Sequence, residues 1–319
     1  MREPESLCIH VENEHGHQFR QYQALFALLG HRVFALGDPE APPPDLVVAM
    51  LPRQDRRLCS ESPVLASVHN RKRLDALAGR TPEGMAMAAR HGHWLVKREA
   101  DAAALRDAYG VETAVAPYYY PDLAGAGPPD PARPVALLCA SYINRYDRVG
   151  RGRGFERFEL VRQTLGEGCA WYGAGSAHGV VVDDAVAFRR ARFTLNLKHW
   201  GYVCNAVVRS LCAGVPVVMD RRSFEIGRYE GFLAPRCGLV VLDTVHEIAA
   251  FVRDLPAAPY AALSREADES AARFRRPPQD LSALDALLRR CAATARLRPA
   301  ARPSRAPGSA RTRGPAAAG

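Results

Sequence analysis

Lysine is scarce in this sequence, and long apolar runs and an apolar leader are missing from it. Of the 43 basic residues, all but three are arginine. No uninterrupted apolar run approaches the roughly 18 residues that a bilayer-spanning helix needs. The opening residues, MREPES, are polar where a secretion signal has an apolar core. These absences argue against a membrane-spanning or exported protein, and we expect a cytoplasmic one.

Closely spaced cysteine pairs are missing as well. None of the eight cysteines lies in a C-x-x-C pair, so nothing supports a zinc knuckle or a thioredoxin-type site. Several cysteines fall inside apolar runs, where a free cysteine behaves as a small hydrophobic residue. We therefore predict reduced, structural thiols.

The net charge of +9 is concentrated at the C-terminal end. Six arginines and no acidic residue follow Ala292, and the rest of the chain carries only +3. A polyanion partner requires basic residues clustered on one face, and the body of the chain has no such cluster. We do not expect a nucleic-acid partner. Residues 293–319 are rich in Ala, Arg, Pro and Gly without periodicity, which predicts a disordered basic tail.

Short apolar runs alternate with amphipathic stretches along the chain. Residues 6–119 contain runs such as SLCIHV, DLVVAML and HWLVKR, separated by stretches with helical spacing such as QFRQYQALFALLG. A second series of the same kind begins at VALLCASY. Near-continuous apolar strands that alternate with helices are typical of parallel sheets covered on both faces. The sequence therefore predicts repeated βαβ units.

The segment PDLAGAGPPDPARP separates the two series. Its density of Pro and Gly cannot continue a helix or a central strand. We predict an α/β fold with two Rossmann-like domains facing across a cleft, in which a linker at 123–134 joins residues 1–122 to residues 135–292. Ligands of such sheets bind beyond the carboxyl ends of the strands. The candidate site loops are 11–18, 69–73, 141–153, 173–183 and 198–205.

The loop KHWGYVCN leads into a predicted helix at 206–213. Asn205 suits the N-cap position, and a helix N-terminus favours a phosphate. Lys198 could add a point charge, and Tyr202 could shape the pocket. An ordinary strand–loop–helix joint with a structural cap would have the same sequence pattern, so this alternative stays open. Arg209 lies one turn beyond Asn205 among apolar residues. A buried arginine needs an anionic partner, and both an anionic ligand and an internal carboxylate remain open.

Two further loops of the second domain carry candidate donor-binding residues. Arg145 and Arg148 follow the first strand of this domain, and guanidinium groups at a strand end suit bidentate phosphate binding. Gly173 lies in YGAGS after the next strand, where a lone G-x-G is a weak signal.

In the first domain, His17 follows the opening strand and could act as a base on a hydroxyl. His15 and His17 lack a third ligand at a sensible spacing, so no metal site is predicted. His69 and Asn70 end another strand and could face the same cleft.

The second domain resembles the nucleotide-binding half of GT-B glycosyltransferases, particularly the retaining nucleotide-sugar transferases. SLCAGVPVVMD resembles their helix ending Ala-x-Gly-x-Pro-Val with its buried strand. VETAVAPYYYPD resembles the segment that closes their first domain, and HVENEHGHQFRQYQALFALLGHRV resembles their opening strand and helix. Only the Ala-Gly-Val-Pro-Val segment matches the family pattern closely. Arg209 and Gly201 stand where the family has its two donor-contacting glutamates.

The resemblance implies a glycosyltransferase that moves a sugar from a nucleotide diphosphate sugar to an acceptor hydroxyl. Arg145, Arg148, Gly173, Lys198, Tyr202, Asn205 and Arg209 are then the donor-binding residues. His17 faces the acceptor, and neither metal nor cofactor is expected. The absent glutamate pair leaves open a non-catalytic GT-B-like binding protein, and a sugar-nucleotide epimerase of the same fold is a further alternative.

Overall fold

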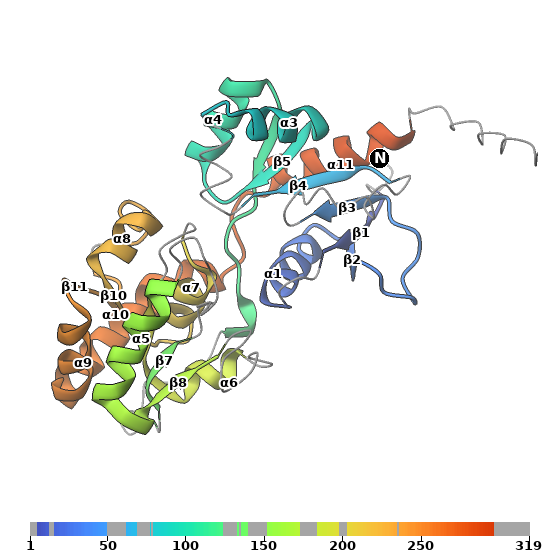
Figure 1. Ribbon diagram of the computed structural model, residues 1–319. Helices are drawn as coiled ribbons and strands as arrows, with labels where there is room; N and C mark the ends of the chain where they lie inside the picture. The colour runs from blue at the N-terminus through green and yellow to red at the C-terminus, as the bar shows by residue number, and fades with distance from the viewer. Residues whose placement is uncertain are drawn as a thin grey trace, which may run out of the picture.

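The computed structural model consists of two parallel β-sheets with helices packed around them (Figure 1). The structure describes residues 5–12, 16–49, 62–68, 77, 79–123, 133, 135–139, 152–172, 184–197, 203–234 and 236–296.

The first sheet has six strands in the order β2-β1-β3-β4-β5-β6. All of its pairings are parallel, with Ile9 of β1 opposite Val33 of β2 and Leu46 of β3. The central strands β1 and β3 are buried throughout, and β3 is fully apolar, because helices cover both faces. The strands are β1 Cys8–Val11, β2 Arg32–Ala35, β3 Leu46–Ala49, β4 Val64–Ser67, β5 His93–Val96 and β6 Glu112–Val115.

The second sheet has five strands in the order β11-β10-β9-β7-β8, again all parallel. β9 lies at its centre, so β7 and β8 lie on one side of it and β10 and β11 lie on the other. The strands are β7 Val135–Cys139, β8 Cys169–Trp171, β9 Ala191–Asn196, β10 Val217–Asp220 and β11 Leu239–Leu242.

Helices connect the strands of both sheets. Within the described ranges, no helix combines the length and apolarity that crossing a bilayer requires. The helices are α1 Gly16–Ala27, α3 Pro82–Arg90, α4 Glu99–Tyr109, α5 Gly152–Leu165, α6 Asp184–Arg189, α7 Asn205–Cys212, α8 Arg221–Gly227, α9 Val245–Asp254, α10 Ala257–Arg275 and α11 Ser282–Arg296, with short 3-10 turns at Pro121–Leu123 and Gly166–Gly168.

Local chemistry explains where several of these helices begin and end. Thr244 and Glu247 form a capping box at the start of α9, in which each side chain bonds the other residue's backbone N–H. Thr81 caps α3 through Gly84 N, with Pro82 in the first turn. Gly110 ends α4 in the left-handed conformation. Helices α3 and α8 were not predicted, because α3 is rich in small residues and α8 is a short, mostly polar segment.

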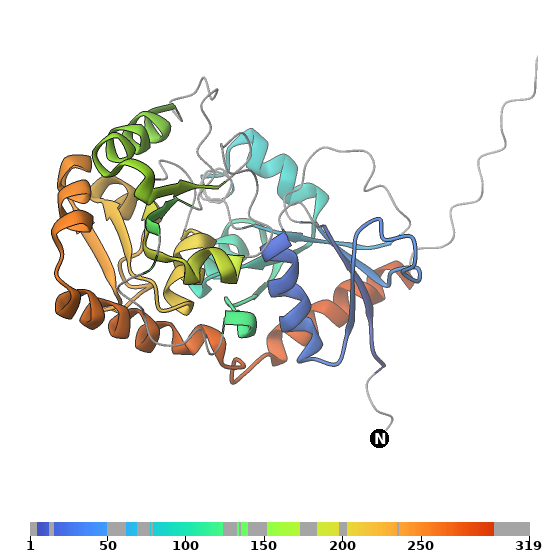
Figure 2. The same ribbon diagram turned by 90° about the horizontal axis from the view of Figure 1, so that it is seen from below.

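The C-terminal helices join the two sheets. In Figure 2 the orange to red part of the chain, α10 and α11, runs along one side of the molecule from the second sheet to the first. The predicted range 135–292 includes α11, yet its buried face belongs to the first sheet's core, with Leu284, Leu287, Leu288 and Cys291 packed against Leu46 and Leu95. This packing continues the helix to Arg296, into the range predicted as a tail. Residues 297–319 lie outside the described residues.

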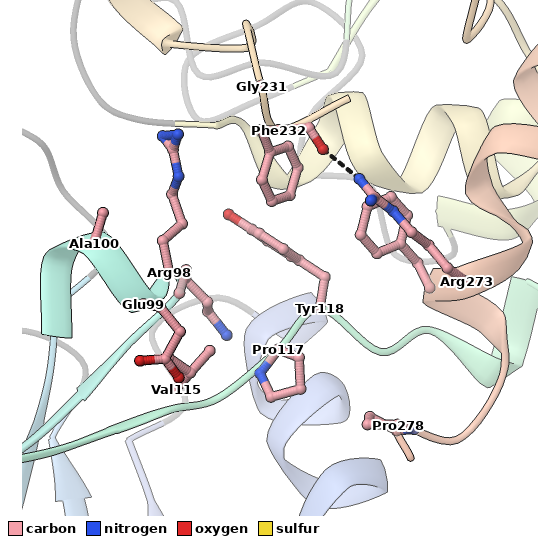
Figure 3. A pocket seen from close by; sticks show the side chains of 12 residues that line it. Arg98, Glu99, Ala100, Val115, Pro117, Tyr118, Gly231, Phe232, Arg273 and Pro278 are labelled. Atoms are coloured by element: carbon pink, nitrogen blue, oxygen red, sulfur yellow. Dashed lines mark hydrogen bonds between the residues drawn. The ribbon is translucent and has the colours of Figure 1, made fainter. Parts of the chain in front are cut away.

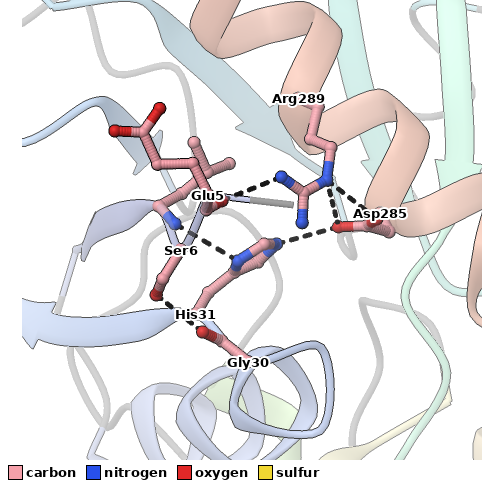
Figure 4. A network of polar contacts seen from close by, with 7 residues as sticks. Glu5, Ser6, Gly30, His31, Asp285 and Arg289 are labelled. Carbon is pink, nitrogen blue, oxygen red and sulfur yellow. Dashed lines mark hydrogen bonds and ion pairs between the residues drawn. The ribbon is translucent and has the colours of Figure 1, made fainter. Parts of the chain in front are cut away.

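A polar network fastens α11 to the first sheet (Figure 4). His31 Nδ1 accepts a hydrogen bond from Leu7 N at 3.4 Å, so Nε2 carries the proton and donates to Asp285 Oδ1 at 2.9 Å. Arg289 Nε donates to Asp285 Oδ2 at 2.9 Å, and its Nη1 donates to the carbonyl of Glu5 at 2.9 Å. The side chain of His31 is fully buried, so the network holds it in one neutral tautomer.

This network makes a pH-dependent contribution to stability. Burial lowers the pKa of His31 below its ordinary value of 6.5, against the opposing effect of Asp285. Below that pH the unfolded chain takes up a proton that the folded chain does not, so the free energy of unfolding falls as pH falls. We expect the free energy of unfolding of the native protein to fall between about pH 7 and pH 5. Its fall should be steeper than that of His31→Gln by up to about 1.4 kcal/mol per pH unit.

Urea unfolding at several pH values measures this difference in slope. The matched control is His246→Gln, because His246 is exposed at the start of α9. An equal slope for the native protein and His31→Gln would contradict the proposed neutral, buried imidazole.

Candidate functional site

Most of the predicted donor-binding residues lie outside the described residues. These are Arg145, Arg148, Gly173, Lys198 and Tyr202. His69 and Asn70 lie outside as well. His17 belongs to the first turn of α1, but its side chain is not described. Of the predicted donor-binding residues, the structure therefore shows the surroundings of Asn205 and Arg209 alone.

Asn205 does not cap α7 as predicted. The helix begins at Asn205 itself, the N-cap is Cys204, and no side chain caps it. The Asn205 Oδ1 atom instead accepts a hydrogen bond from the hydroxyl of Tyr120 at 3.3 Å. The reason is tertiary: Tyr120 comes from the end of the first domain, and the amide side chain turns toward it.

Arg209 has an internal carboxylate partner. Only 1% of its surface is exposed. Its Nη2 donates to Asp122 Oδ2 at 3.1 Å, and its guanidinium carbon lies 4.8 Å from the ring centre of Tyr120. Of the two alternatives left open by the sequence, this arrangement supplies the internal one. A role for Arg209 in donor binding stays a prediction.

A short strip of chain, Pro117–Leu123, forms the junction between the two domains. The Tyr118 hydroxyl donates to the carbonyl of Val203 at 3.1 Å, in the loop before α7. The Tyr120 hydroxyl lies between Asn205 of α7 and Gln21 of α1, whose Oε1 is 3.4 Å away. Burial raises the pKa of Tyr120 well above its ordinary value, so this hydroxyl stays a neutral donor. One apolar cluster runs through the strip from β5 to α7 and α10.

Lys97 lies beside this junction, at the end of β5. Its Nζ donates to the carbonyl of Ala116 at 3.0 Å and lies 4.7 Å and 5.2 Å from the ring centres of Tyr22 and Tyr118. Only 6% of the residue is exposed. Burial lowers the pKa of Lys97 to about 7, so the amine can exist in either state near neutrality.

A cavity of about 480 Å³ opens between the two domains next to Lys97 (Figure 3). The first domain contributes the β5–α4 turn and part of the junction strip. The second domain contributes Gly231 and Phe232, which follow α8, and the end of α10 with Arg273. Its lining combines cations with aromatic rings, a combination suited to an anionic ligand.

Sequence reasoning missed this cavity. The signals were present: Lys97 and Arg98 follow a buried strand directly, at the carboxyl end where ligands bind. Phe232 and Arg273 carried no comparable signal, because a loop and a helix end far apart in sequence supply them.

The thiols offer no nucleophile. The described cysteines are all buried and free, as predicted for structural thiols. Burial raises the pKa of Cys169 to about 11 and that of Cys212 to about 12, which keeps both protonated. Among the described residues, no three His, Cys, Asp or Glu side chains gather where they could hold a metal ion.

The fold is similar to that of solved glycosyltransferase structures. Anabaena HepE in complex with UDP-glucose matches at 11% identity and a TM-score of 0.54, over 90% of this chain and 99% of that chain. A glycosyltransferase from Rickettsia africae matches at 9% identity and a TM-score of 0.51, over 92% of this chain and 98% of that chain.

The other comparisons add little. The chain spans about half (54%) of TarM, which it matches at 10% identity, a TM-score of 0.49 and 76% of its own length. No protein-family model and no curated protein matches the sequence. At these identities the likeness concerns the fold, and it confirms the predicted class: this chain has an α/β fold of the GT-B type, with two Rossmann-like domains.

Proposed function

We propose that this chain transfers a glycosyl group from a nucleotide diphosphate sugar to an acceptor hydroxyl. The observation that supports this most strongly is the extent of the likeness to HepE, whose structure was solved with UDP-glucose and which this chain matches over nearly the whole length of both. The cleft between two such domains is where this fold class binds its ligands.

Electrostatic stabilisation of the leaving diphosphate is the chemistry we propose for the second domain. Arg145, Arg148 and Lys198 would face the diphosphate from loops beyond the strand ends, together with the N-terminal amides of α7. Gly173 and Tyr202 would line the donor pocket. His17, at the start of α1, would face the acceptor hydroxyl as a base. This scheme requires no bound metal.

Asn205 and Arg209 take different roles in this proposal. Asn205 would shape the donor pocket while it holds the Tyr120 hydroxyl. Arg209 is bonded to Asp122, and we propose that it supports the junction strip behind α7. It then acts on the donor site through Tyr120 and Asn205.

A panel of uridine, guanosine and adenosine diphosphates and their glucose conjugates tests the proposal by thermal shift. One of them should raise the melting temperature, since a ligand at a hundredfold excess over its Kd stabilises the native state by about 2.7 kcal/mol. For domains of this size that corresponds to about 5–10 °C. The variant Arg145→Gln/Arg148→Gln should lose most of this shift.

The matched control for that variant is Arg162→Gln, because Arg162 lies exposed on α5, paired with Glu159. Release of free sugar from the bound donor then reports turnover. Binding without turnover would favour a non-catalytic protein, and interconversion of the sugar without acceptor would favour an epimerase. No shift and no turnover with any donor would contradict the proposed transferase.

A further inference from the structure

The cavity between the domains has an aromatic wall built from both of them. Tyr118 of the junction strip meets Phe232 and Phe274 edge to face, at ring-centre distances of 5.5 Å and 6.2 Å. Phe232 and Phe274 stack at 5.8 Å with an interplanar angle of 18°. Figure 3 shows the Tyr118 and Phe232 side chains next to each other in the lining of the cavity. Such a wall offers flat apolar contact to a ring or another apolar group.

Three basic side chains lie around this wall. Arg98 and Arg273 approach Phe232 from two sides, with guanidinium carbons 5.8 Å and 5.6 Å from its ring centre. Figure 3 shows that Arg98 comes from the first domain and Arg273 from the second. Lys97 completes the set beneath Tyr118. Arg273 has no carboxylate partner among the described residues, and burial lowers the pKa of its guanidinium.

The acidic residue in the lining does not neutralise this group. The Glu99 side chain is 79% exposed and lies 3.9 Å from Arg106, two turns further along α4. The cavity therefore concentrates positive charge beside aromatic rings. Cations held in a partly desolvated space bind an anion more strongly than cations on an open surface do.

We propose that this cavity is a binding site for a small molecule with a phosphate or carboxylate group on an aromatic or apolar body. The anion would lie between Arg98 and Arg273, and the apolar body would pack on Tyr118 and Phe232. A volume of about 480 Å³ is within the range of small-molecule sites. Because the two arginines belong to different domains, the bound molecule bridges the domains.

The order of the second sheet separates this site from the proposed diphosphate site. In the sequence, Arg145 and Arg148 follow β7 and Gly173 follows β8, the two strands on one side of β9. Phe232 follows β10 and α8, and Arg273 lies on α10; β10 and β11 are on the other side of β9. We propose that the two sites are separate, and competition with UDP tests this separation. The inference does not depend on the proposed transfer reaction, because the cavity would bind its anion whether or not the chain turns over a sugar donor.

Titration calorimetry with phenyl phosphate tests this inference. Phenyl phosphate should bind to the native protein. Inorganic phosphate lacks the ring and benzyl alcohol lacks the charge, so each should bind at least about tenfold more weakly. Arg98→Gln should weaken phenyl phosphate about tenfold, since a charge-assisted hydrogen bond is lost. Arg98→Lys should restore part of the affinity. Arg273→Gln, checked for a native circular dichroism spectrum, should weaken it similarly.

The control variant is Arg253→Gln, because Arg253 lies exposed on α9 and pairs with Asp254. It should bind phenyl phosphate as the native protein does. Saturating UDP should leave that affinity unchanged. Equal binding by Arg98→Gln and the native protein would overturn the inference, as would phosphate binding that does not need the ring. If UDP competed with phenyl phosphate and Arg98→Gln also weakened UDP binding, the cavity would belong to the donor site. That result would overturn the inference of a separate site. Failure of every nucleotide to bind would leave the cavity result standing and remove only the proposed function.

Discussion

Gly238→Ala is expected to lower the free energy of unfolding by about 3 kcal/mol, the sum of a backbone and a packing cost. Gly238 precedes β11 and has a φ of 70°, which side-chain-bearing residues rarely adopt. A Cβ atom there would lie 2.5 Å from the Cβ of Ala267 and 2.7 Å from the carbonyl oxygen of Leu263. Both contacts belong to α10. The carbonyl of Gly238 also accepts from Val217 N at 2.9 Å, so the backbone cannot move away from the helix without loosening β10.

Gly110→Ala separates the two costs. Gly110 also has a positive φ, of 63°, but a Cβ there would meet no atom within 4 Å. Gly110→Ala should lower the free energy of unfolding only by the backbone cost, about 1 kcal/mol. Urea unfolding of both variants measures the difference. Equal losses would show that the start of β11 does not pack as closely on α10 as described.

Asp122→Ala is expected to cost about 2–3 kcal/mol, at or below the lower end for a broken buried ion pair. The substitution removes the carboxylate that Arg209 bonds at 3.1 Å and leaves its guanidinium buried against Tyr120. The cost lies at this lower end because the Asp122 side chain is 38% exposed, so water can reach part of the vacated space. The junction strip should loosen with it.

Two further variants make this prediction specific. Replacing Arg209 as well, as Asp122→Ala/Arg209→Met, should restore much of the stability because no buried charge is left. Asp254→Ala breaks an exposed pair with Arg253 and should leave the stability almost unchanged, because water and salt screen exposed charges. If Asp122→Ala left stability unchanged and weakened nucleotide binding instead, Arg209 would be a ligand-binding residue, as the other alternative requires.

Much of the architecture could be predicted from local patterns. The runs LVVAML and VPVVM are apolar throughout, which is typical of strands in a sheet covered on both faces. Their alternation with helical spacing specified a parallel sheet in each half. Segments without such periodicity were harder to predict. Helix α8 was missed because its sequence, RRSFEIG, has no sustained apolar face; Asp220 caps it by accepting from Ser223 N at 2.8 Å.

The candidate site was less predictable than the fold. Arg209 could be recognised as a buried charge in need of an anion, because an apolar helix surrounded it. Which anion it meets depended on Asp122, a residue 87 positions away in sequence. Asn205 is of a residue type that often caps helices, but its side chain bonds the Tyr120 hydroxyl instead. Such competition between a local and a distant partner leaves no trace in local sequence.

The amino-acid order by itself determined the two α/β series, the break between them and the apolar burial of the thiols, because each depends on interactions between near neighbours or on composition. The tertiary structure alone decided that α11 returns to the first sheet, that Arg209 is bonded to Asp122, and that Arg98 and Arg273 flank one phenylalanine ring. These features join residues distant along the chain, and only the folding of both domains brings them together.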